Sequence, residues 1–335
     1  MNFRRPNRRW LAALLGMAGL LLAPTAGLGQ PAQDTKAGAA VRAPQTLPPE
    51  SVTSHRMAVG ERTLQFRARA GATQILDAGK GTSLAEIAYV SFELEGADPK
   101  LRPIVFVFNG GPGAGSAWLA LGGLGPWRIR MDGDALTPSA SPDLIENQES
   151  WLPFADLVFV DPPDTGYSKI TSSDGEVRKQ FSSVSGDIDV LAVFVRKWLI
   201  AHDRLASPKF IAGESYGGFR APRLAQRLVE RENIAVRGLL LISPALDLSF
   251  DEGRSPLAFA ARLPSFAAVA RGGADRRALA DVESYAAGEY IVDLIKGPRD
   301  KEAQIRLTRN VAAFTGLDPK LVSEMSGRID LYQRS

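Results

Sequence analysis

The sequence of 335 residues contains no cysteine and only two histidines, His55 and His202. The lack of cysteine excludes a disulfide scaffold, a thiolate nucleophile and a zinc–thiolate site. A composition that is 45% hydrophobic and 23% charged also excludes collagen, a coiled coil and a disordered tail. The length suffices for one large domain, or one domain plus an insertion, with a substantial buried core.

The chain also has little net charge once its N-terminus is set aside. The formal charge is +3, and Arg4, Arg5, Arg8 and Arg9 lie in a stretch without acidic residues. Without these four arginines the chain is slightly acidic. We therefore predict no nucleic-acid partner.

Residues 1–29 have the layout of a secretory signal peptide. The arginines precede an uncharged run over residues 10–23, and small residues around Gly27 and Gly29 predict cleavage near Gln30. The run is too short to span a bilayer comfortably, which disfavours an uncleaved anchor. We expect an exported protein, periplasmic or secreted, without a stable membrane anchor after cleavage.

The remaining chain divides into a flexible leader, an α/β core and a helical block. Residues 30–50 are rich in Pro, Ala, Gln and Thr, which is typical of a flexible leader. Residues 54–95 favour antiparallel strands with a turn at Gly60. Four short apolar runs follow, and they predict strands buried on both faces of a mostly parallel sheet: Ile104–Phe108, Leu157–Val160, Phe210–Ala212 and Leu239–Ile242.

Helical periodicity lies between and after these strands, so the core, residues 51–249, is assigned to the α/β class. One helix is predicted to begin at Ser185 as its N-cap, and another over residues 219–230. Residues 250–335 are predicted to form a helical insertion. Within it, Gly316 ends one helix, and Asp318 begins the next.

The sequence Gly213-Glu214-Ser215-Tyr216-Gly217 follows a predicted strand and precedes a predicted helix. A G-x-S-x-G sequence in this context predicts a nucleophile elbow, in which small neighbours permit a sharp turn that exposes the serine hydroxyl. The alternative is a glycine-rich turn whose serine only caps the helix.

The glycine-rich segment Asn109-Gly110-Gly111-Pro112-Gly113 comes directly after the strand Ile104–Phe108. Glycines there allow the backbone to approach a ligand and to direct N–H groups at an anion. A phosphate-binding loop is excluded, because that motif needs a lysine before its serine and Gly115 is followed directly by Ser116. A plain loop is the remaining alternative to an oxyanion-binding loop.

Together, Phe108–Gly113, Val160–Ser168 and Gly213–Gly218 resemble the serine carboxypeptidase family in order and approximate spacing. The resemblance covers most of the chain from about His55 onward and is closest to a bacterial branch. It implies an α/β-hydrolase fold for residues 51–249 and removal of C-terminal amino acids from peptide substrates. It indicates no metal and no organic cofactor.

The resemblance implies that Ser215 is the nucleophile and that the backbone N–H groups of Gly111 and Tyr216 bind the oxyanion. Asn109 and Glu214 bind the C-terminal carboxylate of the substrate. A carboxylic acid that faces a carboxylate must share a proton with it, because two negative charges repel. We therefore expect exopeptidase activity to fall as the pH rises and Glu214 ionises.

The sequence departs from the family pattern at two places. Gly122 and Gly123 occupy the stretch where the family commonly has a second acid, which predicts weaker carboxylate recognition. Asp164 stands where the pattern favours glycine, in a turn expected near the active site.

The catalytic partners of Ser215 are not found. A hydrolase of this fold carries its triad in the order Ser, acid, His, whereas His55 and His202 both precede Ser215. His202 is expected at the far edge of the sheet, His55 in the N-terminal β region, and Asp247 as a turn residue before the insertion. The family's acid and histidine lie beyond the insertion. We therefore expect a truncated chain that lacks its final strands and is inactive by itself.

The sequence thus predicts a serine-type carboxypeptidase that acts through a Ser215 acyl-enzyme, with water as the second acceptor. Two alternatives remain open. One is an acyltransferase of the same fold, and the other is a non-catalytic, degenerate module that binds peptides. The sequence does not predict the oligomeric state.

Overall fold

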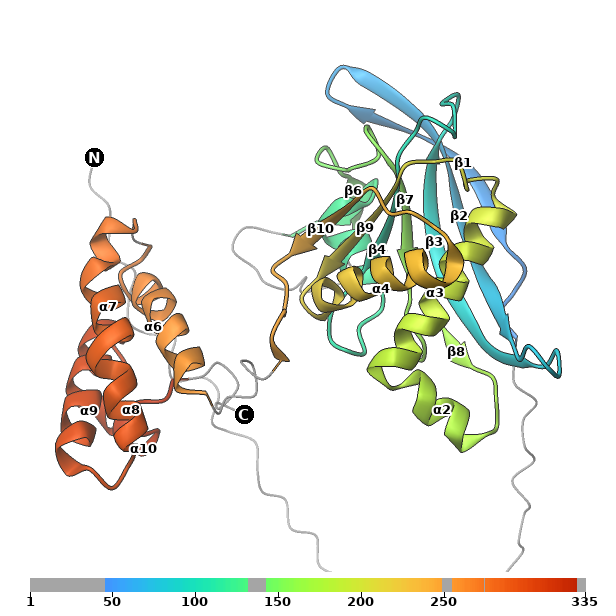
Figure 1. The fold of residues 1–335 in the computed structure, drawn as a ribbon. Helices are drawn as coiled ribbons and strands as arrows, with labels where there is room; N and C mark the ends of the chain where they lie inside the picture. The colour runs from blue at the N-terminus through green and yellow to red at the C-terminus, as the bar shows by residue number, and fades with distance from the viewer. Residues whose placement is uncertain (1–45, 132–142, 249–254, 274, 330–335) are drawn as a thin grey trace, which may run out of the picture. The chain divides into compact units, whose positions relative to one another are not determined.

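The computed structural model describes residues 46–131, 143–248, 255–273 and 275–329, so the predicted signal peptide lies outside the described part. Figure 1 shows a twisted sheet with helices on its face, followed in the chain by a group of helices coloured orange to red. The α/β class expected from the sequence is confirmed.

The sheet has strand order β1-β2-β3-β7-β4-β9-β10, with β8 paired to β3. The strands of the sheet are β1 Ser51–Val59, β2 Arg62–Leu76, β3 Ser83–Leu94, β4 Ile104–Phe108, β7 Asp156–Val160, β8 Lys169–Ile170, β9 Lys209–Glu214 and β10 Gly238–Ile242. β1, β2, β3 and β7 are antiparallel neighbours, whereas β7, β4, β9 and β10 run parallel. The predicted turn at Gly60 joins β1 to β2 with φ of 56°. A separate two-stranded sheet consists of β5 Trp127–Ile129 and β6 Leu144–Glu146.

Each face of the sheet carries its own hydrophobic core. Alternate residues of a strand point to opposite faces, and β4 is buried throughout. Ile104, Phe106 and Phe108 belong to the core shared with the helices that follow β8 and β9. Val105 and Val107 belong to the opposite core, which also contains residues of β1, β2 and the segment before β7. A strand buried on both faces needs apolar residues at every position, as the run Ile104–Phe108 predicts.

Helices α2 Gly175–Phe181, α3 Val184–Ala201 and α4 Tyr216–Glu232 connect the later strands (Figure 1). The prediction of Ser185 as the N-cap of α3 is wrong by two residues. Ser183 is the N-cap, and its hydroxyl accepts a hydrogen bond from Gly186 N at 3.1 Å. Both serines satisfy the preference for a short polar N-cap, and the chain conformation after α2 decides between them. A short helix, α1 Ala117–Leu119, and a π-helical turn, Ala120–Leu124, follow the loop after β4.

The prediction that Leu239–Ile242 is buried on both faces is wrong. Leu239 and Leu241 are 40% and 41% exposed. β10 pairs only with β9 among the described strands, so it forms one edge of the described sheet. An edge strand has a neighbour on only one side, which leaves part of its side chains uncovered.

The end of the predicted leader, residues 46–50, contacts the sheet. Leu47 N donates a hydrogen bond to Glu86 Oε2 at 2.9 Å, and Glu50 forms an ion pair with Arg69 at 2.9 Å. These contacts place the residues directly before β1 against β2 and β3.

Residues 255–329, with residue 274 outside the described part, are helical as predicted. The helices are α6 Pro256–Ala270, the 3-10 turn Arg277–Leu279, α7 Ala280–Tyr285, the π-helical turn Ala286–Tyr290, α8 Ile291–Lys296, α9 Lys301–Thr315 and α10 Pro319–Glu324. They enclose a core that includes Phe259, Tyr290 and Leu307. Arg306 donates two hydrogen bonds to the buried Asp293 carboxylate, at 2.6 and 2.9 Å, and lowers the pKa of Asp293.

The caps of this helical block follow the predicted pattern. Gly316 is the C-cap of α9 with φ of 67°, and Asp318 is the N-cap of α10, where its carboxylate accepts a hydrogen bond from Lys320 N at 2.7 Å. Local sequence suffices here, because a cap needs only a glycine or a short polar side chain at the right position.

Replacing Asp300 with alanine is expected to destabilise the helical block by about 1 kcal/mol. Asp300 is the N-cap of α9, and its Oδ1 accepts a hydrogen bond from Ala303 N at 3.0 Å. Urea unfolding followed by far-ultraviolet circular dichroism measures the change. Asp300→Asn keeps an accepting side-chain oxygen and is expected to retain most of the stability. Equal losses for both substitutions would show that the cap does not carry the effect.

Candidate active site

Ser215 occupies the bend between β9 and α4, with φ of 53° and ψ of −116°. A positive φ is uncommon for a residue other than glycine, so surrounding contacts must hold this conformation. Ser215 N donates a hydrogen bond to Ile242 O at 3.0 Å, and Ser215 O accepts from Gly218 N at 2.9 Å and from Ala245 N at 3.0 Å. The chain therefore forms the tight strand-to-helix turn that the G-x-S-x-G sequence predicts.

Two glycines allow this turn to pack. A Cβ at Gly213 would overlap the carbonyl oxygen of Gly217, and a Cβ at Gly217 would overlap the carbonyl oxygen of Phe108. Both clashes involve backbone atoms, which cannot swing aside as a side chain can. The glycines on either side of Ser215 are thus required by the close approach of the elbow to itself and to the end of β4.

The glycine-rich loop after β4 lies directly against Ser215. A Cβ at Gly110 would lie 2.7 Å from the Cβ of Ser215 and 3.0 Å from the carbonyl oxygen of Glu214. Gly110 N donates a hydrogen bond to Glu214 Oε2 at 3.2 Å. Gly111, next in the loop, is exposed and has φ of 108°. The structure therefore brings together the two segments that the sequence analysis singled out separately.

Asn109 is buried, at 4% exposure, and two of its oxygen atoms accept hydrogen bonds. Its side-chain Oδ1 accepts a hydrogen bond from Leu119 N at 3.0 Å, and its backbone oxygen accepts from Arg220 Nη1 at 3.1 Å. Because the amide oxygen is engaged by Leu119, the NH₂ group of Asn109 is the part of the side chain available to donate to a ligand.

Tyr216 is the first residue of α4, so its N–H is among those that the helix itself does not bond. Its side chain is buried at 7% exposure, and its ring lies 5.2 Å from that of Phe219. The Arg220 guanidinium lies 5.0 Å from the Tyr216 ring centre. Burial raises the pKa of Tyr216, and the nearby Asp187 carboxylate adds to this effect. The phenol therefore stays neutral in ordinary buffers.

Sequence reasoning missed two buried charged residues near this loop. Arg220 donates to Asp187 Oδ2 at 2.7 Å as well as to Asn109. The signal for Arg220 was its place one helical turn after Tyr216 on α4, where residues four apart share a face. The pairing with Asp187, 33 positions away, was not readable from the sequence.

The second missed residue is Asp161, which ties two loops together. Its Oδ1 accepts a hydrogen bond from Ser116 N at 2.6 Å, and its Oδ2 accepts from Tyr167 N at 2.9 Å. These amides lie in the loops that follow β4 and β7. Asp161 belongs to one of the motifs that carried the family resemblance, but its spacing alone did not indicate this cross-link.

The two departures from the family pattern lie in short turns, where Asp164 and Gly122 are exposed and Gly123 is half-buried. Asp164 has φ of 60° and forms an ion pair with Arg178 at 2.8 Å, and both side chains are about half exposed. A Cβ at Gly122 or Gly123 would meet no atom within 4 Å, so neither glycine is required by packing.

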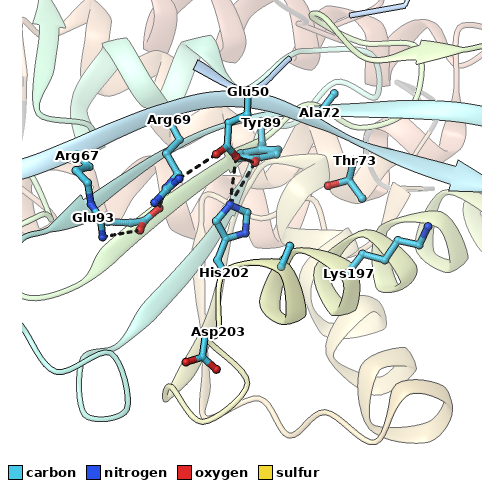
Figure 2. A pocket seen from close by; sticks show the side chains of 11 residues that line it. Glu50, Arg67, Arg69, Ala72, Thr73, Tyr89, Glu93, Lys197, His202 and Asp203 are labelled. Carbon is cyan, nitrogen blue, oxygen red and sulfur yellow. Dashed lines mark hydrogen bonds and ion pairs between the residues drawn. The ribbon is translucent and has the colours of Figure 1, made fainter. Parts of the chain in front are cut away.

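His202 lies in a different part of the core unit, in the wall of a charged cavity of 630 Å³ (Figure 2). Its Nε2 is 3.2 Å from Glu50 Oε2, and its Nδ1 is 2.8 Å from Trp198 O. It is the C-cap residue of α3, before β9, whereas Ser215 follows β9. Six strand residues at ~3.3 Å each separate the two ends by about 20 Å, so His202 is not placed to be the base of Ser215.

The cavity around His202 is a network of paired charges. Figure 2 shows the side chains of Glu50, Tyr89 and His202 pointing toward one another. Arg69 forms ion pairs with both Glu50 and Glu93. Burial raises the pKa of Glu50, but hydrogen bonds to Tyr89, His202 and Arg69 outweigh it and hold the pKa below its usual value. Within this cavity Arg69 therefore balances the charges of Glu50 and Glu93.

His55 is a packing residue of β1. Its ring stacks on Phe66 at 5.6 Å and meets Trp127 edge-on at 4.8 Å, and its Nε2 bonds Thr53 Oγ1 at 2.7 Å. Neither histidine contacts Ser215 within the described residues. Asp247 is exposed after β10.

Within the described ranges, no group of three or more histidine or acidic residues is placed to hold a metal ion. The helices of these ranges are all too short or too polar to cross a lipid bilayer.

Comparison with known sequences decides the family. A sequence model of the family described as serine carboxypeptidase matches residues 66–260, more than half of the chain. The chain belongs to the serine carboxypeptidase family. The matched residues include the elbow at Ser215 and the loop after β4.

Two relatives illustrate the similarity. The chain is 30% identical over 170 residues to serine carboxypeptidase-like 33 of Arabidopsis thaliana, covering 48% of this chain and 33% of the relative. It is 35% identical over 147 residues to a pheromone-processing carboxypeptidase of Talaromyces marneffei, covering 40% of this chain and 21% of the relative. The chain thus spans a third or less of these relatives.

Among solved structures, the chain is similar to a prohormone-processing carboxypeptidase of Saccharomyces cerevisiae. The identity is 20% and the TM-score 0.47, with 74% of this chain and 53% of that chain covered. The relatives named here are plant and fungal proteins, so a bacterial branch stays a prediction.

Proposed function

We propose that this protein is a serine-type carboxypeptidase that releases C-terminal amino acids from peptides through a Ser215 acyl-enzyme. One observation carries the proposal: Gly110 packs on Ser215 while its N–H donates to Glu214, so the serine, the glycine-rich loop and a carboxyl group meet at one place. Family membership supports the reaction class.

In the proposed reaction, Ser215 Oγ attacks the carbonyl carbon of the last peptide bond, and its proton passes to a base. The C–N bond then breaks, the amine leaves with a proton, and water hydrolyses the Ser215 ester to regenerate the serine. The N–H groups of Gly111 and Tyr216 are proposed to bind the oxyanion. Gly111 is exposed in the loop that contacts Ser215, and Tyr216 N lies in the first turn of α4, where the helix itself does not bond the N–H groups.

Recognition of the substrate's C-terminus is assigned to Asn109 and Glu214. The Asn109 NH₂ group can donate to a carboxylate, since Leu119 N already occupies the amide oxygen. Glu214, when protonated, can share its proton with that carboxylate. The Gly110 N–H holds Glu214 in place at 3.2 Å.

The base and its orienting acid are proposed to come from residues other than His55 and His202. Both histidines make other contacts, with Thr53 and aromatic rings in one case and with Glu50 in the other. Neither histidine is therefore assigned a role in the proposed reaction.

The test compares matched peptides with a free and an amidated C-terminus, using the product of the complete gene. Release of the last amino acid only from the free-acid peptide, together with fluorophosphonate labelling mapped to Ser215, supports the proposal. Product in which the acyl group has moved to an added alcohol or amine indicates an acyltransferase. Peptide binding without labelling or turnover indicates a non-catalytic module. Either of these results contradicts the proposal.

Replacing Glu214 with glutamine is expected to flatten the fall in exopeptidase activity between acidic and neutral pH. A negatively charged Glu214 that faces the substrate carboxylate repels it, whereas glutamine carries no charge at any pH. The profile of kcat/KM against pH measures this, with hydrolysis of an uncharged ester as the control. An unaltered profile in the variant would remove Glu214 from carboxylate recognition.

Export is proposed from residues 1–29, which lie outside the described part. N-terminal sequencing of the mature protein is expected to begin near Gln30.

A further inference from the structure

The side chain of Arg220 is only 3% exposed, although it carries a permanent charge. Burying an unpaired charge costs several kcal/mol, so a buried guanidinium must be matched by acceptors. Arg220 has two of them on two separate segments. Its Nε donates to Asp187 Oδ2 at 2.7 Å, and its Nη1 donates to the backbone oxygen of Asn109 at 3.1 Å.

One guanidinium thereby joins three parts of the fold. Arg220 lies on α4, one turn after Ser215 and Tyr216, and Asp187 lies in the first turn of α3. Asn109 begins the loop that contacts Ser215. The planar guanidinium fork presents N–H groups in fixed directions, so it can hold Asp187 and Asn109 in one geometry, whereas a lysine ammonium sits on a flexible stem without such a fork.

The close packing of Gly217 against the end of β4 also restrains Asn109. A Cβ at Gly217 would lie 3.0 Å from Asn109 O and would overlap Phe108 O. The backbone at the end of β4 therefore approaches α4 as closely as glycine allows, and Arg220 supplies the hydrogen bond that fixes the Asn109 carbonyl there. With Leu119 N on its Oδ1, Asn109 is restrained at its backbone and at its side chain.

We propose that Arg220 is a positioning residue, which with Asp187 fixes the segment Asn109–Gly111 against the elbow. The assignment rests on the proposed function, in which that segment binds the oxyanion and the substrate carboxylate. Arg220 is not itself placed on the reacting atoms: its ring contact is with the buried Tyr216 side chain, and its hydrogen bonds are to Asp187 and Asn109. Burial raises the pKa of Asp187 more than Arg220 lowers it, which marks the pair as strongly desolvated.

The test compares the wild-type protein with three variants. Arg220→Lys keeps the charge opposite Asp187 but loses the fork. The double substitution Asp187→Leu with Arg220→Met removes both charges together, which folded proteins tolerate better than the loss of one partner. Arg223→Met is the matched control: Arg223 lies one turn further along α4, is exposed and stacks on the Phe219 ring.

Hydrogen exchange of peptides from residues 109–119, compared with peptides from β2, reads the position of the loop without requiring activity. In Arg220→Lys and in the double variant, exchange over 109–119 is expected to be about tenfold faster, because a hydrogen bond that restrains the loop is lost. Exchange in β2 is expected to stay unchanged, and Arg223→Met to resemble the wild type.

The second measurement is the rate of fluorophosphonate labelling at Ser215, which is expected to fall about 10- to 100-fold in Arg220→Lys through misplacement of the loop. Unchanged exchange over 109–119 in both Arg220 variants overturns the proposal. An equal rise of exchange in β2 also overturns it, since that pattern shows general destabilisation. Wild-type protein that is not labelled at Ser215 contradicts the proposed function instead, and the exchange result still decides the role of Arg220.

Discussion

Replacing Ser215 with alanine in the full-length protein is expected to abolish fluorophosphonate labelling and to lower peptide hydrolysis by about 10³- to 10⁶-fold. Without the hydroxyl no acyl-enzyme forms, and only oxyanion binding and substrate positioning remain. The fold is expected to persist, because the turn is held by backbone hydrogen bonds of Ser215 to Ile242, Gly218 and Ala245, which alanine retains. Mass spectrometry of the labelled protein and steady-state kinetics measure the effect.

The matched variant Ser215→Gly separates catalysis from backbone strain. It removes the same hydroxyl, but glycine adopts φ of 53° freely, whereas serine and alanine do not. Strain of about 1–3 kcal/mol is relieved, and glycine's greater freedom in the unfolded chain offsets about 0.5–1 kcal/mol of it. Ser215→Gly is therefore expected to be inactive but about 1 kcal/mol more stable than Ser215→Ala. Equal stabilities would mean that the elbow stores no strain, and continued labelling of either variant would exclude Ser215 as the nucleophile.

Replacing Gly217 with alanine is expected to destabilise the protein by about 3 kcal/mol and to slow Ser215 labelling by about 100-fold. The added methyl group would overlap Phe108 O and lie 3.0 Å from Asn109 O. Since both are backbone atoms, α4 and the loop after β4 must separate, which moves the proposed oxyanion donor Gly111 N away from the serine. Urea unfolding and labelling kinetics measure the two effects.

The control for this substitution is Gly122→Ala. A Cβ at Gly122 meets no atom within 4 Å, and the residue is exposed. Its stability is expected to stay within about 0.5 kcal/mol of the wild type. If Gly217→Ala behaves like Gly122→Ala, the close approach between α4 and the end of β4 is not what positions the loop.

Much of the fold was readable from local sequence. The run Ile104–Phe108 is apolar at every position and forms a strand buried on both faces. The glycine and aspartate at 316 and 318 end one helix and begin the next. These predictions succeed because a buried central strand and a helix cap each depend on residues that are adjacent in the chain.

The errors arose where neighbours distant in sequence decide the outcome. The run Leu239–Ile242 resembles that of β4 in composition, but β10 is an edge of the described sheet and is partly exposed. Ser183 and Ser185 are both acceptable N-caps by residue type, and only the chain conformation before α3 selects Ser183. Burial and cap position are properties of the surroundings, which a short window of sequence does not contain.

For the site, the order of residues was enough to identify the reactive groups: a serine between glycines after a strand, a glycine-rich loop after an earlier strand, and two histidines that both precede the serine. Their contacts became known from the folded chain: Gly110 packs on Ser215, Arg220 donates to both Asp187 and Asn109, and neither histidine contacts the serine within the described residues. Residue type and local spacing fix what a short segment can do, whereas contacts between residues more than a hundred positions apart arise only when parallel strands are placed side by side in the sheet.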